Sequence, residues 1–399
     1  MRTICLTIIL VEKQTAVKLY SLAVIRGLQS ASYAISIPFL SIYLYNVRGV
    51  PMSLVGTIIG FAAVLGSFLR FYAGRLSDTL PTDTVMKLGL FLRASGFLGF
   101  SILILLKANP LLFFFFFLLN SSGASFFMSA SDVFVAKNID EPDRPFAYSV
   151  IRVGGNLGFA IGPSIGGFIS RYSYAMTFFA SFLLQVICVF LIIYLVSSRE
   201  ERKSVNLTKE ISFGDVFKNK NFMLFIAGTF VLSLLMGQLI STLSVYAKHK
   251  GLDNVQIGYL YSINGFMVVF FQMLIIKVVD YLGYKKGLVL GSLLYSVGYF
   301  YFAFSHNFTN FAIGVIVLTT GEMLAMPLLT TITSAMAPDD KRGLYIGFLG
   351  FIEGLSWAVA PFIGGVLIDI FLKTPVLIWG TVASFGVISS IIFMKVRFN

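Results

Sequence analysis

The sequence predicts an all-α membrane protein of twelve transmembrane helices, arranged as two parallel-repeat bundles of six helices each. Three observations carry this prediction: a composition too apolar for water, twelve long apolar runs, and an internal repeat. Of the 399 residues, 57% are hydrophobic and 12% are charged, whereas a soluble protein carries about 25% charged residues. The side chains therefore need lipid as their solvent, and the lipid bilayer is the first expected partner.

The second observation is the set of apolar runs, each long enough for a transmembrane helix of roughly 20 residues. The runs lie at 18–45, 52–75, 86–106, 110–136, 146–169, 174–197, 221–246, 255–278, 287–305, 309–336, 343–371 and 375–394. We therefore expect an N-terminal cytoplasmic segment at 1–17, a six-helix bundle at 18–197, a cytoplasmic linker at 198–220 and a second bundle at 221–399.

The distribution of Lys and Arg predicts the orientation. With both termini inside, the inner segments hold 19 of the 30 basic residues and the outer loops hold 6. Cytoplasmic loops carry an excess of positive charge, so we expect a multi-pass protein of the cell (inner or plasma) membrane with both termini cytoplasmic. Because the basic residues sit in the short gaps between apolar runs, the net charge of +12 does not indicate nucleic-acid binding.

The residues that commonly carry chemistry are scarce. Cys5 and Cys188 form no disulfide framework, His249 and His306 stand alone, and the chain has no phosphate-binding loop of the GxxxxGK[ST] type. We expect no metal and no other cofactor. A polytopic enzyme is disfavoured, and so is a non-transporting sensor, which would usually carry an added soluble domain.

The third observation is the repeat. Shifting the second half by 202 residues aligns Gly49 with Gly251, Gly56 with Gly258, Asp78 with Asp280 and Gly89 with Gly291. After the third helix the shift becomes 198, and it then aligns Gly123 with Gly321, Arg144 with Arg342, Pro163 with Pro361 and Gly166 with Gly364. An even number of spans in each half keeps the halves parallel, a layout typical of transporters whose site lies between the halves near the midplane.

Two motifs occur in both halves. Gly74-Arg75-Leu76-Ser77-Asp78 follows the second span, and Gly158 to Gly167 reads G-x-x-x-G-P-x-x-G-G in the fifth; the second half has related segments from Asp280 and from Pro361. The chain resembles the major facilitator superfamily, whose loop motif is G-x-L-x-D-x-x-G-R-K, and in particular its drug:proton antiporter branch, which carries the fifth-helix motif. The resemblance covers the chain from about residue 18.

The sequence also departs from that family. Pro81-Thr82-Asp83 stands where the loop motif has G-R-K, and the fourth-helix arginine that the family links to proton coupling is missing near Phe117. The resemblance nevertheless implies gating roles, and the stripe of small residues allows close helix packing. The candidate gating residues are Gly74, Asp78, Asp132, Asp280, Gly158, Gly162, Pro163, Gly166 and Gly167.

Charged residues inside spans are costly and are functional candidates by default. Glu322 and Glu353 fall near the midplane at ~1.5 Å per residue, and we expect one of them, Glu353 first, to carry a coupling proton; an internal Arg–Glu salt bridge is the alternative. We expect Arg70 and Arg93 simply to reach toward the inner headgroups. The substrate-binding candidates are Arg26, Gln29, Tyr33, Arg152, Asn156, Gln238, Asn264 and Trp357, although a plain interhelical hydrogen bond stays open for each amide.

These expectations combine into a monomeric secondary transporter that exports small organic compounds in exchange for protons. Uptake or facilitated transport of an anionic metabolite, with Arg26 and Arg152 holding its charge, is the alternative.

Overall fold

The computed structural model describes residues 2–140, 143–196, 214–338 and 341–397, without the side chains of residues 2–15, Ser67, Phe71, Gly74, Asp78, Pro145, Gly214 and Asp215. The first half contains α1 (Arg2–Ile42), η1 (Tyr43–Val47), α2 (Met52–Thr79), α3 (Thr82–Leu105), α4 (Leu112–Asn138), α5 (Arg144–Tyr172), α6 (Tyr174–Leu191) and η3 (Ile192–Val196). The second half contains α7 (Gly214–Lys218), α8 (Lys220–Ile240), α9 (Thr242–His249), α10 (Asn254–Leu282), α11 (Tyr284–Tyr301), η4 (Phe302–Phe304), α12 (Phe308–Met336), α13 (Arg342–Phe371) and α14 (Pro375–Lys395).

Each predicted span coincides with a helix or with two consecutive helical segments, which confirms the all-helical fold class. In the described residues, ten helices are long and apolar enough to cross a membrane. The other two predicted spans, α1 and α5, are helices of 41 and 29 residues. Helix α1 begins at Arg2, well before the predicted start of the first span. Helix α5 is continuous, but its sequence contains several glycines together with Arg152 and Asn156, which make it less apolar.

The chain divides into two compact units, residues 1–36 with 65–207 and residues 37–64 with 208–399. This division differs from the predicted halves at residues 37–64, which group with the second half. Close packing of α2 on α13 accounts for the difference. A β-carbon at Gly56 would lie 2.2 Å from the carbonyl oxygen of Pro361, and one at Gly60 would lie 1.9 Å from that of Ala358. Only a residue without a side chain permits such an approach.

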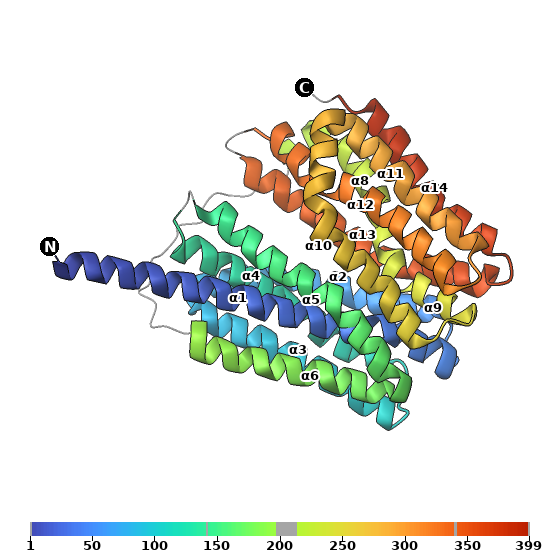
Figure 1. The fold of residues 1–399 in the computed structure, drawn as a ribbon, viewed down its shortest axis with the longest axis horizontal. Helices are drawn as coiled ribbons and strands as arrows, with labels where there is room; N and C mark the ends of the chain where they lie inside the picture. Colours follow the sequence, from blue (N-terminus) through green and yellow to red (C-terminus); the bar gives the residue numbers. More distant parts are fainter. Residues whose placement is uncertain (1, 141–142, 197–213, 339–340, 398–399) are drawn as a thin grey trace. The chain divides into compact units, whose positions relative to one another are not determined.

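Equivalent helices make equivalent contacts in the two units. Helix α3 packs against α4 and α6, as α11 packs against α12 and α14 (Figure 1). Gly89 meets Gly123 where α3 crosses α4, and their repeat partners Gly291 and Gly321 meet where α11 crosses α12. The alignment made from the sequence therefore superposes two helix crossings of the same kind.

The two halves also correspond at the turn that follows the first span, where each has a glycine with a positive φ angle. Gly49 has φ of 64° and Gly251 has φ of 93°. Both values lie in the left-handed region, which favours glycine. Each glycine ends a helical segment ahead of the next span, so the repeat extends to the turns.

In the first unit, the small residues of α5 pack against α1. A β-carbon at Gly158 would lie 1.9 Å from the carbonyl oxygen of Gly27, and one at Gly166 would lie 2.0 Å from that of Ile35. Gly162 meets Ala31 at 2.8 Å in the same way. Pro163 lies inside α5, where it removes a backbone donor and bends the helix. The motif thus shapes the α1–α5 interface.

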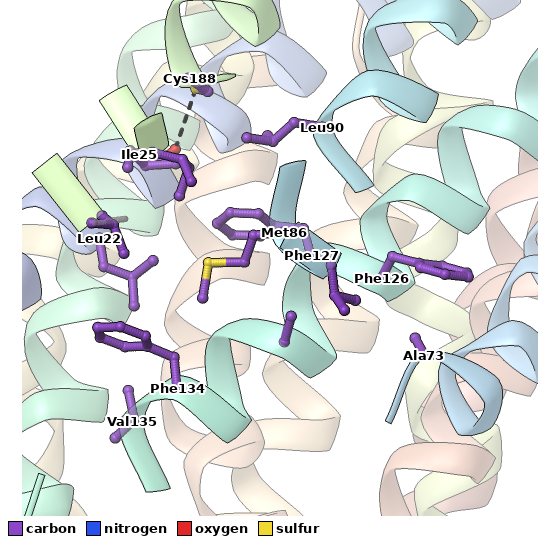
Figure 2. Close-up of a cluster of buried hydrophobic side chains, with 14 of the residues drawn as sticks. Leu22, Ile25, Ala73, Met86, Leu90, Phe126, Phe127, Phe134, Val135 and Cys188 are labelled. Atoms are coloured by element: carbon purple, nitrogen blue, oxygen red, sulfur yellow. Dashed lines mark hydrogen bonds between the residues drawn. The ribbon is translucent and has the colours of Figure 1, made fainter. Parts of the chain in front are cut away.

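The apolar core of this unit lies between α1, α3, α4 and α6. Figure 2 shows Leu22 and Ile25 of α1 near Met86 and Leu90 of α3, with the thiol of Cys188 directed at the Ile25 carbonyl oxygen at 3.8 Å. Phe127 and Phe134 of α4 complete it. This core holds α1 beside α3, and that placement matters for the polar residues of both helices.

We predict that Gly158→Ala destabilises the protein by about 1–3 kcal/mol, the usual cost of forcing extra atoms into a well-packed interior. Gly155→Ala on the same helix is the matched control, since a β-carbon there meets nothing nearer than the Arg26 side chain at 3.4 Å. Both changes gain the same helix propensity. The measurement is thermal melting in detergent, and equal melting temperatures for the two variants would contradict the close α1–α5 contact.

Candidate functional site

The second unit holds an acid in the middle of a membrane-spanning helix. Glu322 lies midway between Phe308 and Met336, the ends of α12. The side-chain amide of Asn264 on α10 donates to Glu322 Oε2 at 2.8 Å and to Thr319 Oγ1 at 2.9 Å. Asn264 is buried and Glu322 is half-buried. The Asn264 amide therefore holds the carboxylate on one side, while Glu322 as a residue keeps part of its surface exposed.

Among the described residues, no cation is paired with this carboxylate. Two ion pairs, Arg70–Asp132 and Lys87–Asp83, lie in the first unit. Tyr295 and Tyr299 of α11 are buried, and their ring centres lie 5.5 Å apart. Both tyrosines interact electrostatically with Glu322. Glu322 is thus an acid in a polar but uncharged setting.

The other predicted residues of the second unit have distinct surroundings. Glu353 and Trp357 are half-buried, one turn apart on α13. Gln238 is fully buried; its amide donates to the Ala360 carbonyl oxygen at 2.8 Å and accepts from Thr242 Oγ1 at 2.5 Å. The bond to Ala360 ties α8 to α13, so Gln238 makes the interhelical hydrogen bond that the sequence left open as an alternative.

In the first unit, Arg26, Gln29 and Tyr33 lie on one face of α1, as the helical spacing predicts. Arg26 and Tyr33 are half-buried, whereas Gln29 is fully buried. On α5, Arg152 is exposed and Asn156 is half-buried. Neither Arg26 nor Arg152 belongs to the Arg70–Asp132 or the Lys87–Asp83 ion pair, and a joint role of the two arginines stays a prediction.

The expectation that Arg93 reaches toward the inner headgroups is wrong. Arg93 lies in the middle of α3 and only 4% of it is exposed. Its guanidinium carbon stands 5.9 Å from the ring centres of both Tyr33 and Phe97. The sequence did contain a signal, because Arg93 falls close to the centre of the predicted third span. Arg70, in contrast, is exposed and pairs with Asp132.

The predicted gating residues are only partly described. The Arg70–Asp132 pair measures 3.4 Å, and both side chains are about half exposed (51% and 53%). Asp280 is exposed at the end of α10. The side chains of Gly74 and Asp78 lie outside the described residues. The roles of all these residues in gating stay predictions.

Sequence reasoning missed Asp369. The backbone N–H groups of Met52 and Ser53, at the start of α2, donate to Asp369 Oδ1 and Oδ2 of α13, both at 2.8 Å. A carboxylate at a helix N-terminus satisfies otherwise unpaired donors and interacts favourably with the helix dipole. The sequence did contain the spacing Gly56-x-x-x-Gly60, which is typical of close helix contact and indicates that α2 packs tightly on another helix. It does not indicate that Asp369 lies on that helix.

Comparison with known proteins identifies the family. The sequence description of the Major Facilitator Superfamily matches residues 22–361 and 239–398. The chain belongs to the major facilitator superfamily. It is a multi-pass membrane protein, and its family is one of transporters, which implies a small-molecule substrate.

The chain is similar to several bacterial transporters. The chain is 28% identical over 228 residues to the uncharacterized MFS-type transporter YttB of Bacillus subtilis, covering 56% of this chain and 57% of YttB. It is 26% identical to multidrug resistance protein 2 of the same organism, covering 84% of each. It is 24% identical over 176 residues to the quinolone resistance protein NorA of Staphylococcus aureus, covering 44% and 45%.

Solved structures share the fold. The nucleoside transporter NupG superposes with a TM-score of 0.80 at 14% identity, covering 96% of this chain and all of NupG. A peptide transporter POT in complex with sulfate superposes with a TM-score of 0.74 at 14% identity, covering 94% and 93%. At these identities the likeness concerns the fold.

We predict that Asp369→Asn lowers the melting temperature, with a loss of about 0.5–2 kcal/mol, as for other helix caps. The amide has one acceptor oxygen, so one of the two N–H groups of α2 loses its partner. Asp253→Asn is the control. Asp253 accepts only the N–H of Gln256 at the start of α10, and Asn serves as well as Asp at such a cap. Equal effects of the two substitutions would contradict the two-bond cap at Asp369.

Proposed function

We propose that the protein is a proton-coupled secondary transporter that exports small organic compounds by alternating access, with Glu322 as the proton-carrying acid. The observation that carries this proposal is the setting of Glu322: mid-helix, half-buried, bonded by the Asn264 amide and facing no cation. Ionisable groups at such depth mark ion or substrate pathways.

The absence of a paired cation near Glu322 makes the proton exchangeable. An acid in a buried salt bridge leaves its partner uncompensated when it is protonated, at a cost of about 3–5 kcal/mol. Protonation of Glu322 leaves no such orphan, and Asn264 and Thr319 still satisfy each other. On this ground we place Glu322 before Glu353, which the sequence ranked first; Glu353 stays the second candidate.

Export of organic compounds is supported by the fifth-helix motif and by the names of two relatives, which describe multidrug and quinolone resistance proteins.

We propose that both termini are cytoplasmic, on the strength of the 19-to-6 distribution of basic residues. Labelling of a cysteine at position 250 from inside only would contradict that orientation. On this topology Asp369 and the start of α2 lie on the outer side.

Transport of an anionic solute is the second candidate function. It is favoured by the arginines of the first unit, because neither Arg26 nor Arg93 forms an ion pair among the described residues. Such a substrate would be compatible with proton coupling through the second unit.

We predict that Glu322→Gln abolishes accumulation driven by a pH gradient and preserves substrate exchange. The amide keeps the size and the hydrogen bond to Asn264 but carries no proton. The measurement uses proteoliposomes loaded with a panel of cationic, neutral and anionic compounds that includes a quinolone, with counterflow as the exchange assay. Glu353→Gln, measured in parallel, ranks the two acids.

Loss of accumulation in Glu353→Gln alone would show that Glu322 is not the proton carrier. Accumulation by the wild type that ignores the pH gradient would reject proton coupling altogether. Thermal melting of both variants in detergent separates a coupling defect from misfolding, because only misfolding lowers the melting temperature.

A further inference from the structure

The first unit contains a buried cation without an anion. Arg93 is 4% exposed, and its Nε has no hydrogen-bond partner among the described residues. Its neighbours in the electrostatic sense are Arg26, which repels it, and Tyr33 and Cys188. The rings of Tyr33 and Phe97 offer cation–π contact at 5.9 Å, which is worth only a fraction of an ion pair. Nothing described neutralises this guanidinium.

Two further polar side chains of the first unit are also unsatisfied. Both polar atoms of Gln29, on α1, and Nδ2 of Asn120, on α4, are buried without a hydrogen-bond partner in the described part of the chain. Gln29 is 0% exposed and Asn120 is 2% exposed. Buried polar groups are normally hydrogen-bonded, so two such side chains beside an unpaired guanidinium call for a ligand.

The packing places these groups together. A β-carbon at Gly123, one turn from Asn120 on α4, would lie 2.7 Å from Arg93 Cγ. Asn120 Cβ in turn lies 3.1 Å from the equivalent position at Gly96, one turn beyond Arg93 on α3. Gln29 is one turn from Tyr33, which contacts Arg93. Tyr33 of α1 and Asn120 of α4 thus lie next to the stretch of α3 that carries Arg93, and Gln29 follows one turn away on α1.

The repeat shows that the fold does not require this cluster. The repeat shifts of 202 and 198 place Gly228 at the position of Arg26, Val231 at Gln29, Leu235 at Tyr33, Tyr295 at Arg93 and Leu318 at Asn120. The second unit makes the same helix crossings with none of these charges or amides. The first unit therefore contains these polar side chains although the second unit, which makes the same helix crossings, has no charge or amide at the equivalent positions.

We infer that Arg93, Gln29 and Asn120 form an anion-binding site in the first unit, which receives a carboxylate of the transported solute with Arg26 beside it. The guanidinium presents a planar fork of donors that matches a carboxylate, and the two amides add donors from other helices. Charge-assisted bonds of this kind are the strong ones in a protein. The identity of the solute rests on the proposed transport function, whereas the site itself rests on the contacts of Arg93.

The test measures binding to the full-length protein in detergent at low ionic strength. The probes are acetate, benzoate and inorganic phosphate, with acetamide and benzamide as neutral counterparts of the first two. We expect the anions to bind and the amides not to bind. Arg93→Gln should weaken benzoate binding about ten- to a hundred-fold, which corresponds to one charge-assisted bond. Arg171→Gln, at the exposed end of α5, makes the same charge change and should leave binding unaltered.

Two further readings separate a binding role from a structural one. Without ligand, Arg93→Gln should melt at the same temperature as the wild type or higher, since it removes an uncompensated buried charge. Asn120→Leu, which copies Leu318 of the second unit, should fold and bind benzoate more weakly. It serves the same purpose if Arg93→Gln does not accumulate in the membrane.

The inference is overturned if none of the three anions binds, if the amides bind as well as the anions, or if both variants bind benzoate like the wild type. Binding that follows these expectations, together with flux that ignores the pH gradient, would retain the site and reject proton coupling. The two proposals therefore fail separately.

Discussion

The hydrocarbon core offers no water to solvate a charge, so every ionisable group within it must find a partner in the protein or carry a function. Many polar side chains of the described helices find such a partner within the protein. The hydroxyls of Ser101, Ser296 and Ser356 each donate to a carbonyl oxygen on another helix. Against that background, the charged side chains Arg26, Arg93 and Glu322, which form no ion pair among the described residues, are the candidates for function.

These groups are divided by sign between the two units. Among the described residues, Arg26 and Arg93 of the first unit form no ion pair with an acid, and Glu322 of the second unit forms none with a cation. The division is not a property of the fold, because the repeat partners of Arg93 and Glu322 are Tyr295 and Ala124. In the proposed account, the second unit binds and releases the proton while the first recognises the solute.

A second constraint is the close approach of helices at glycine. Gly56 and Gly60 bring α2 onto α13, and Gly158 and Gly166 bring α5 onto α1. These contacts leave no space for a side chain, so the helices meet through backbone atoms. Asp369 adds a pair of hydrogen bonds at the end of the α2–α13 contact.

Hydrophobic run length and glycine spacing predicted the helices and the repeat, because the bilayer imposes both. The residue pair Gly123 and Gly321 was found by alignment alone and proved to make equivalent helix crossings. The sequence did not predict which group each buried polar side chain bonds to. Gln238 and Asn264 are both amides in spans, yet one ties α8 to α13 and the other holds Glu322. The depth of Arg93 could be read from the sequence, but its contact with Tyr33 and the bonds of Asp369 to Met52 and Ser53 join helices far apart in the sequence, and no local pattern encodes such partners.

The central claim is that Glu322 changes its protonation during transport, and infrared difference spectroscopy tests it most directly. The account predicts that substrate binding to the wild-type protein removes the carbonyl stretch of a protonated carboxyl group, and that Glu322→Gln lacks this change. A carbonyl signal that persists in Glu322→Gln, or a wild-type protein that shows no carboxyl signal on binding substrate, would contradict it.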